Sequence, residues 1–440
     1  MEIHVIGAGL AGCETAFFLA EREIKVKLYD IKPEKLTEGH KSKNFGELLC
    51  SNSLRGDSLT NAVGLLKEEM RIAGSLMMKC AEKTKVPAGG ALAVDRKKFE
   101  ECMTEYIKSH KNIDVFCEEI VNPDELAGIK VIAAGPLATD RLTDWIAKKT
   151  GKNNLFFFDA IAPIVDGETI DYSKTFFASR YEKGEGSDYL NCPMNKEEYL
   201  EFWNALIDAE TVKLKDFEKN KKLFEGCLPV EEIAKRGEDA LRFGPLKPVG
   251  LKNPDTGEEY YAVVQLRKED KEGRFYNLVG FQTHLTYPEQ KRVFRLIPGL
   301  ENARFERFGR MHKNTYINSP EVLDNFFRLK KDRSIFFAGQ ISGVEGYVES
   351  AASGLMVGFF IYSMLKKGEP LHFPKETALT GLTRHISMKT SNFQPSNITF
   401  SLIPDIEKRI KNRRERRLAI AERSLEKLKQ FVNVNFFLQK

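Results

Sequence analysis

The chain has 440 residues and a formal net charge of only +5, with 42% hydrophobic and 30% charged residues, the composition of an ordinary soluble globular protein of two or three domains. No stretch approaches about 18 uninterrupted apolar residues, and the opening MEIHVIGAGLAG lacks the basic and apolar regions of a signal peptide, so we expect no membrane span. Its 7 cysteines include no C-x-x-C pair, which favours a reducing cytoplasm and argues against a disulfide framework or a metal site.

The first predicted elements are a strand over 3–6, an amphipathic helix that ends near Arg22, and a second strand over 25–30. A G-x-G-x-x-G motif lies between the first strand and the helix, and Asp30 ends the second strand. Such glycines let a helix N-terminus meet a pyrophosphate, and an acidic residue about twenty positions later can accept hydrogen bonds from a ribose. The predicted dinucleotide site consists of Gly7, Ala8, Gly9, Leu10, Ala11, Gly12 and Asp30.

Two later segments fit the same domain. Residues 131–136, VIAAGP, predict a buried strand that runs into a turn. Residues 334–358 predict a strand, a glycine-rich loop and a helix that begins near Gly346. A plain close-packed strand and helix is the alternative, whereas a flavin site would use Gly339, Gln340 and Gly346. We favour FAD over S-adenosylmethionine because such a distant second loop is typical of flavoproteins, in which the cofactor supplies the chemistry.

A segment of different character, 156–310, interrupts this domain. It is richer in Tyr, Phe, Asp and Glu, and it contains a turn signal at 253–257 and the strand-like run YYAVVQLRKED. We predict an α/β fold with a Rossmann-type FAD-binding domain split over 1–155 and 311–370, a mixed α+β insertion domain over 156–310, and a basic C-terminal helical segment in 371–440. No second G-x-G-x-x-G occurs, so a nicotinamide cofactor would visit the flavin without a Rossmann domain of its own.

The segment 405–430 contains ten Lys and Arg against five Asp and Glu, so it accounts for the whole net charge. One interpretation is a solvated helix whose buried stripe consists of Ile406, Ile410, Leu418, Leu425 and Leu428. The other interpretation is a surface that binds the phosphates of a nucleic acid. Its candidate RNA-binding residues are Arg413, Arg414, Arg416 and Arg417.

Two cysteines lie in unusual surroundings. Cys50 lies in ELLCSNSLRGD, and Cys227 lies in EGCLPVEE, where a glycine and a proline bend the chain. An isolated cysteine is more often a buried structural residue than a catalyst. The sequence also contains no P-loop, H-E-x-x-H or G-x-S-x-G motif, which excludes the usual nucleotide hydrolases, zinc enzymes and serine hydrolases.

Several long blocks follow one another along nearly the whole chain. They are GAGLAGCE, LCSNSLRGDSLTNAVGLLKEEMR, VPAGGALAVDR, DYLNCPMNKEEY, FEGCLPVEEIAKRG, EQKRVFRLIPGLENA and FFAGQISGVEGYVESAASG. Together they resemble the folate- and FAD-dependent uracil-5-methyltransferases of tRNA, the TrmFO family. The related MnmG family, which modifies the wobble uridine of tRNA, shares the flavin fold but not the EGCLPV and LCSNSLRGD blocks.

The resemblance implies that a one-carbon unit passes from 5,10-methylenetetrahydrofolate through reduced FAD to carbon 5 of a uridine in the T loop of tRNA. NADPH or NADH is the implied reductant. Cys227 corresponds to the family's nucleophile, whose thiolate adds to carbon 6 of the uracil and makes carbon 5 reactive. Cys50 corresponds to its second functional cysteine, near the flavin as an acid/base or protective thiol.

The sequence also departs from the family in places. Where the family commonly has Leu-Tyr-Glu-Met-Arg-Pro, this chain has LYDIKP, and Lys32 lacks the planar fork of an arginine. Ser396 and Ser401 stand where the family has Met and Gly. Two alternatives therefore stay open: the same chemistry on a ribosomal RNA uridine, or a flavin-bearing RNA-binding protein without methyl transfer. Retention of both cysteines argues against the second.

Overall fold

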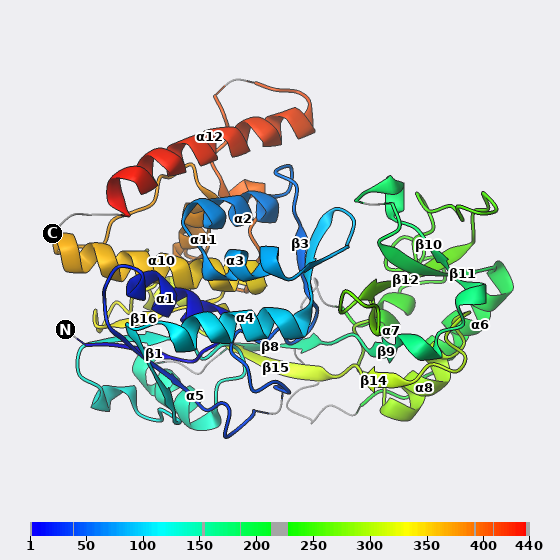
Figure 1. Cartoon of the computed structure of the whole chain (residues 1–440), viewed down its shortest axis with the longest axis horizontal. Helices are drawn as coiled ribbons and strands as arrows, with labels where there is room; N and C mark the ends of the chain where they lie inside the picture. The colour runs from blue at the N-terminus through cyan, green and yellow to red at the C-terminus, as the bar shows by residue number, and fades with distance from the viewer. Residues whose placement is uncertain are drawn as a thin grey trace.

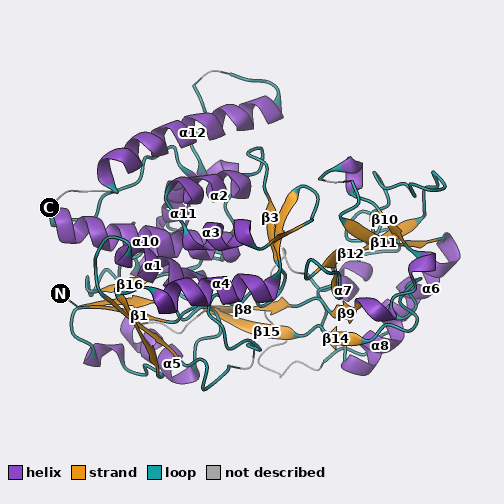
Figure 2. Cartoon of the chain, viewed as in Figure 1, coloured by secondary structure: helices purple, strands orange, loops and turns teal. Residues whose placement is uncertain are grey.

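The computed structural model describes residues 2–37, 39–151, 155–184, 186–212, 228–390, 393–407 and 409–436, with only the backbone described for 155–159 and 311–313. Figure 1 shows a helix-rich unit that contains both termini and, beside it, a second unit with its own sheet. Figure 2 shows that helices predominate in the first unit and that loops are more extensive in the second.

A parallel five-stranded sheet with the order β16-β7-β1-β2-β6 forms the centre of the first unit. Its strands are β1 (Ile3–Ile6), β2 (Val26–Asp30), β6 (Ile113–Cys117), β7 (Ile129–Ile132) and β16 (Ile335–Phe337). The strands β1, β7 and β16 are buried at every residue, as expected of a parallel sheet that is covered on both faces. The predicted Rossmann-type fold is therefore confirmed, although the strand expected over 131–136 starts and ends earlier.

Two helices that follow glycine-rich turns pack together against this sheet. They are α1 (Leu10–Ala20) and α10 (Tyr347–Lys367). Gly354 permits their close approach, because a Cβ there would lie 2.1 Å from the carbonyl oxygen of Ala11. The hydroxyl of Thr15 also donates to the carbonyl of Gly354 at 2.8 Å. By length and composition α10 passes as a membrane span, but 83% of its most apolar window is buried inside the protein, as in a core helix.

The second unit is built on a six-stranded sheet with the order β10-β11-β12-β13-β9-β14. Its strands are β9 (Ile164–Asp166), β10 (Phe176–Phe177), β11 (Tyr189–Met194), β12 (Ala262–Lys268), β13 (Phe275–Leu278) and β14 (Phe305–Arg307). The helix α6 (Lys196–Ile207) begins with a capping box between Asn195 and Glu198 and buries Tyr199, Phe202 and Leu206 on one face. The antiparallel pair β8 (Leu155–Ala160) and β15 (Met311–Tyr316) connects the two units.

The remaining elements complete both units. They are α2 (Ala62–Ile72), α3 (Leu76–Lys83), α4 (Arg96–Ser109), α5 (Asp140–Thr150), α7 (Val230–Ala234), α8 (Tyr287–Phe294), α9 (Ser319–Val322), α11 (Ala378–Ser387), α12 (Arg413–Asn435), and the small sheet of β3 (Ser53–Gly56), β4 (Lys85–Val86) and β5 (Ala91–Val94). The predicted turn at 253–257 is confirmed, because the carbonyl of Asn253 accepts a hydrogen bond from the N–H of Gly257 at 2.8 Å.

The C-terminal helix differs from the sequence-based expectation. It begins at Arg413 because the side chain of Asn412 caps its first turn, and the preceding chain folds back so that the carbonyl of Asp405 accepts from Arg423 at 2.7 Å. Its buried residues are Ile420, Ala421, Ser424, Leu428 and Val432. Of the predicted stripe only Leu428 is fully buried, whereas Ile406, Ile410, Leu418 and Leu425 are half-buried.

Candidate active site

The turn between β1 and α1 requires two of its glycines for packing. Gly7 has φ +104°, and a Cβ there would lie 2.5 Å from the carbonyl oxygen of Ala133. A Cβ on Gly12 would lie 1.8 Å from the carbonyl oxygen of Gly7. Gly9 is different, because a Cβ at this position would meet no protein atom within 4 Å. The missing side chain of Gly9 therefore leaves open space at the N-terminus of α1, where no side chain caps the helix.

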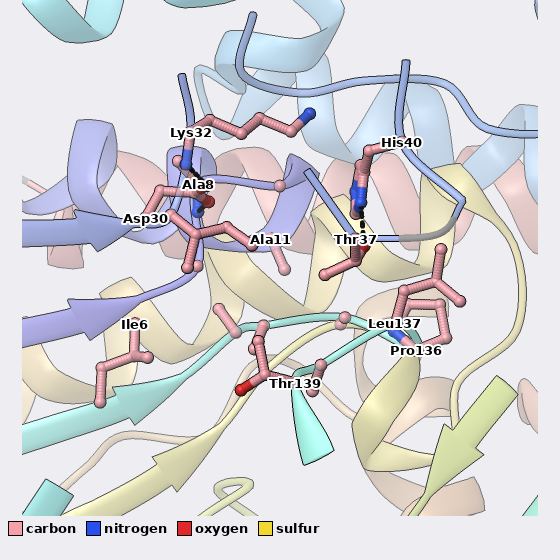
Figure 3. Close-up of a pocket in the computed structure, with 18 of the residues that line it drawn as sticks. Ile6, Ala8, Ala11, Asp30, Lys32, Thr37, His40, Pro136, Leu137 and Thr139 are labelled. Carbon is pink, nitrogen blue, oxygen red and sulfur yellow. Dashed lines mark hydrogen bonds between the residues drawn. The ribbon is translucent and has the colours of Figure 1, made fainter. Parts of the chain in front are cut away.

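This open space belongs to a cleft of about 1090 Å³, open solvent included, at the carboxyl ends of β1, β2 and β7 (Figure 3). The cleft brings together most of the residues predicted for the dinucleotide: Gly7, Ala8, Gly9, Leu10, Ala11, Asp30, Gly339 and Gln340. Gly12 and Gly346 do not line it. Its wall also contains residues that were not predicted individually, among them Thr37, His40, Glu47, Leu49, Tyr347, Ser350 and the whole of 133–139.

Asp30 ends β2 with its carboxylate beside the nucleotide turn. Its Oδ2 accepts from the N–H of Ala8 at 2.6 Å, and its Oδ1 accepts from the N–H of Lys32 at 2.9 Å (Figure 3). A carboxylate offers about four acceptor positions, so two protein donors leave capacity for ribose hydroxyls. The predicted ribose acceptor is thus fixed in place by the backbone on both sides.

Lys32 is part of a buried ion pair rather than a phosphate contact. Its Nζ lies 2.6 Å from Oε2 of Glu47 and donates to the carbonyl of Asn44 at 3.1 Å. Burial, together with the nearby charge of Lys32, lowers the pKa of His40 on the same wall below its ordinary value. Glu47 lies 15 residues after Lys32, a spacing that matches no local motif, so the sequence gives no signal for this pair.

The loop before α10 forms the opposite wall. Gly339 has φ +84°, and its N–H donates to the hydroxyl of Ser353 at 2.7 Å. Gly346 precedes the helix with φ +103°, and a Cβ there would lie 2.5 Å from a carboxylate oxygen of Glu349. Gly346 therefore permits the tight entry into α10, whereas the side chains that face the cleft are those of Tyr347 and Ser350.

Cys50 lies directly after Leu49 of the cleft wall and is partly exposed. The phenol oxygen of Tyr347 accepts from the N–H of Cys50 at 2.6 Å and from that of Ser51 at 3.3 Å. From the second unit, Arg267 donates to the hydroxyl of Ser51 at 2.6 Å and to the amide oxygen of Asn52 at 2.8 Å. The segment that carries Cys50 is therefore held from both units at the edge of the flavin-type cleft.

Cys227 lies outside the described residues, so its predicted role stays a prediction. The chain that follows it is well anchored. The N–H of Val230 donates to the carbonyl of Gln282 at 2.7 Å. The buried carboxylate of Glu231 accepts from the hydroxyl of Thr283 at 2.9 Å and from the N–H of His284 at 2.7 Å. These contacts fix the start of α7, only a few residues after Cys227.

The four arginines predicted to contact RNA occupy different surroundings. Arg413, Arg414 and Arg416 are exposed, and Arg416 lies 3.9 Å from a carboxylate oxygen of Asp405. Arg417 is half-buried, donates to the carbonyl of Thr60 at 3.2 Å and covers the ring of Phe400. Its contacts tie α12 to the first unit, so three of the four guanidinium groups remain available to a ligand.

Comparisons with known proteins cover most of the chain or nearly all of it. A family model described as glucose inhibited division protein A matches residues 2–369. A protein of Acetivibrio thermocellus named methylenetetrahydrofolate--tRNA-(uracil-5-)-methyltransferase TrmFO is 54% identical over 433 residues, which cover 98% of each chain. A protein of the same name from Thermotoga maritima is 52% identical over 436 residues, which cover 99% of this chain and 100% of the relative.

A solved structure of Aquifex aeolicus GidA has a TM-score of 0.71 with this chain, at 17% sequence identity. The match covers 100% of this chain and 74% of that chain. At this identity the likeness concerns the fold, and it agrees with the predicted flavin-binding architecture.

Proposed function

Since the chain belongs to the glucose inhibited division protein A family, and within it to the group of methylenetetrahydrofolate--tRNA-(uracil-5-)-methyltransferases TrmFO, we propose that it methylates carbon 5 of a uridine in the T loop of tRNA. The observation that carries this proposal is the identity of 54% over 98% of both chains. The proposed one-carbon donor is 5,10-methylenetetrahydrofolate.

The cleft fits FAD. Gly9 leaves open space where the N-terminus of α1 can receive a pyrophosphate, and Asp30 lies where a ribose hydroxyl would need an acceptor. When bound, FAD would supply the redox chemistry that carries the one-carbon unit from folate to RNA. The uncapped N–H groups of α1 would hold the phosphates, and Tyr347 would line the cleft beside the cofactor.

We assign the nucleophile to Cys227. Its thiolate would add to carbon 6 of the uracil ring and so raise the electron density at carbon 5, which then forms the new carbon–carbon bond. Loss of the carbon-5 proton and elimination of the thiolate would restore the ring. The one-carbon unit would break its bond to its carrier, and two electrons supplied by reduced FAD would bring it to the methyl level. Cys50 is the second proposed catalytic cysteine, supported by its position next to the cleft wall formed by Leu49 and Tyr347.

We propose NADPH or NADH as the source of electrons. The sequence contains a single G-x-G-x-x-G motif, so the nicotinamide cofactor would have to bind transiently beside the flavin.

We further propose that the protein works in the cytoplasm. None of the six cysteines in the described part of the chain forms a disulfide, which is compatible with a reducing compartment.

The test is a reconstituted reaction. The purified protein is incubated with 5,10-methylenetetrahydrofolate, NADPH and an unmodified tRNA transcript, and the nucleosides are analysed by mass spectrometry. We expect 5-methyluridine in the transcript and none in a matched transcript whose T-loop uridines are replaced by cytidine. A ribosomal RNA transcript tests the alternative substrate in parallel. Absence of 5-methyluridine from every RNA, with FAD bound, would contradict the proposal.

A further inference from the structure

Arg307 links the second unit to the segment that carries Cys50. It is the last residue of β14, at the edge of the six-stranded sheet, and its Nη2 donates to the carbonyl oxygen of Leu49. Burial lowers the pKa of the Arg307 guanidinium, and a negative charge on Cys50 would act in the opposite direction. The guanidinium of Arg307 therefore contacts the main chain of the residue directly before Cys50.

The positive charge of Arg307 has no acidic partner of its own. Within the described ranges, no carboxylate lies within ion-pair distance of its guanidinium, and its buried Nε has no hydrogen-bond partner. Among the groups whose charges act on Arg307, Arg96 is positive and Glu269 is negative, and Glu269 already pairs with Arg96. A half-buried guanidinium without a counter-charge is costly, and a nearby anion would relieve that cost.

The two other arginines around Cys50 are already satisfied. Arg96 pairs with Glu269 through two contacts, of 2.9 and 3.3 Å, so its charge is compensated. Arg267 is held by neutral oxygens of Ser51, Asn52 and Asn277, at 2.6, 2.8 and 3.3 Å. Arg96 is thus paired and Arg267 uses its donors on neutral oxygens, whereas Arg307 keeps a buried Nε without a hydrogen-bond partner.

We propose that Arg307 is a positioning residue that holds Cys50 as a thiolate and fixes its main chain through Leu49. Cysteine thiolates are stabilised beside arginine, and the thiolate in turn supplies the counter-charge that Arg307 lacks. The charged and titratable groups that contact the segment 48–51 are Tyr347 of α10, Arg96 and Glu100 of α4, Arg267 of β12 and Arg307, and Glu269 pairs with Arg96. A catalytic use of the thiolate rests on the proposed function, but its ionisation does not.

The experiment measures the rate at which iodoacetamide alkylates Cys50 in the FAD-bound protein as a function of pH, with peptide mass spectrometry to separate Cys50 from the other cysteines. An ordinary thiol reaches half its maximal rate near its usual pKa of about 8.5. We expect the wild-type midpoint at least one unit lower. Arg307→Gln should raise the midpoint by about one unit and slow alkylation at neutral pH roughly tenfold.

Arg307→Lys keeps the charge and should retain most of the wild-type midpoint. Arg304→Gln is the matched control, because Arg304 lies next to β14, is 68% exposed and pairs with Asp166, so its removal should leave the profile unchanged. A wild-type midpoint in the ordinary range would overturn the proposal, even if Arg307→Gln failed to fold. An Arg307→Gln profile that matches wild type would overturn it as well. Neither readout requires RNA methylation, so this proposal and the proposed function can fail separately.

Discussion

The phenol oxygen of Tyr347 accepts a hydrogen bond of 2.6 Å from the backbone N–H of Cys50, which lies 297 positions earlier in the chain. Tyr347 is the first residue of α10 and lines the cleft. The helix that closes the flavin-type cleft thus also fixes the segment of the second proposed catalytic cysteine. A change at this one oxygen should therefore separate cofactor binding from turnover.

Replacing Tyr347 by Phe leaves two backbone N–H groups, of Cys50 and Ser51, without their acceptor. We expect a loss of about 1–3 kcal/mol of stability and at least a tenfold loss of methyl transfer, with most of the FAD retained. Thermal denaturation, flavin absorbance and 5-methyluridine formation measure the three effects. Tyr199→Phe, which removes a buried phenol contact to the carbonyl of Glu238, should lower stability without this loss of turnover. Equal turnover losses in both variants would refute a specific role.

Replacing Gly9 by Val should remove FAD while leaving the protein folded. A Cβ at position 9 meets no protein atom within 4 Å, so a valine side chain would extend into the space before α1 where the pyrophosphate is expected. We expect flavin content to fall more than tenfold, with a circular dichroism spectrum like that of the wild-type apoprotein. Gly12→Ala is the contrasting variant, because its Cβ would lie 1.8 Å from the carbonyl of Gly7 and should destabilise the fold. Full FAD occupancy in Gly9→Val would show that the pyrophosphate binds elsewhere.

Reversing the charges of Arg413 and Arg414 should weaken tRNA binding. Both side chains are exposed at the start of α12, and each phosphate contact contributes about 0.9 to the slope of log affinity against log salt concentration. We expect that slope to fall by about one to two, with FAD content unchanged. Lys427→Glu with Lys429→Glu makes the same charge change at exposed positions further along the helix. Should both pairs behave alike, net charge rather than a local RNA contact would explain the effect.

The nucleotide turn could be predicted because its requirements are local. A strand, three spaced glycines and an acid at the end of the next strand define the site within 30 residues, and the structure places Gly9 and Asp30 on one cleft. The start of α12 could also be predicted from its N-cap, because Asn412 is a residue that favours this position. The apolar periodicity of the preceding residues instead predicts an earlier start for the helix.

The surroundings of Cys50 could not be predicted in the same way. Arg267 and Arg307 reach its segment only after β12 and β14 have joined the six-stranded sheet and that sheet has met the first unit. No spacing of residues in the sequence predicts these contacts of Arg267 and Arg307 with the segment of Cys50. The buried pair of Lys32 and Glu47 cannot be predicted for the same reason, because only the folded chain brings Glu47 to Lys32.

Stability should depend on pH through Glu69, whose buried carboxylate accepts from the N–H groups of Ala378 and Leu379 and from the hydroxyl of Ser424. Burial raises the pKa of Glu69 from 4.5 to about 7. The folded protein therefore binds this proton more tightly than the unfolded chain, so the stabilisation is complete below pH 4.5 and falls as pH rises to about 7. The loss over this window is about 3 kcal/mol.

Glu69→Gln should reduce the fall of the thermal midpoint between pH 5 and about 7, because one of the carboxyls that titrate in this window is gone. Part of the fall should remain, since burial also raises the pKa of Glu14 to about 7 and that of Glu100 to about 6. Glu68→Gln is the control on the same helix, since the side chain of Glu68 is 38% exposed. Identical slopes in wild type and Glu69→Gln would show that another group causes the pH dependence.

The most direct test of methyl transfer through a cysteine adduct is trapping with a tRNA transcript that contains 5-fluorouridine at the target position, because fluorine cannot leave carbon 5 as a proton does. We predict a covalent protein–RNA complex that survives denaturation for wild type and for Cys50→Ala, and none for Cys227→Ser, with FAD bound in all three. Absence of the complex with wild type would contradict nucleophilic attack on the uracil. A complex with Cys227→Ser would contradict the assignment of Cys227 as the nucleophile.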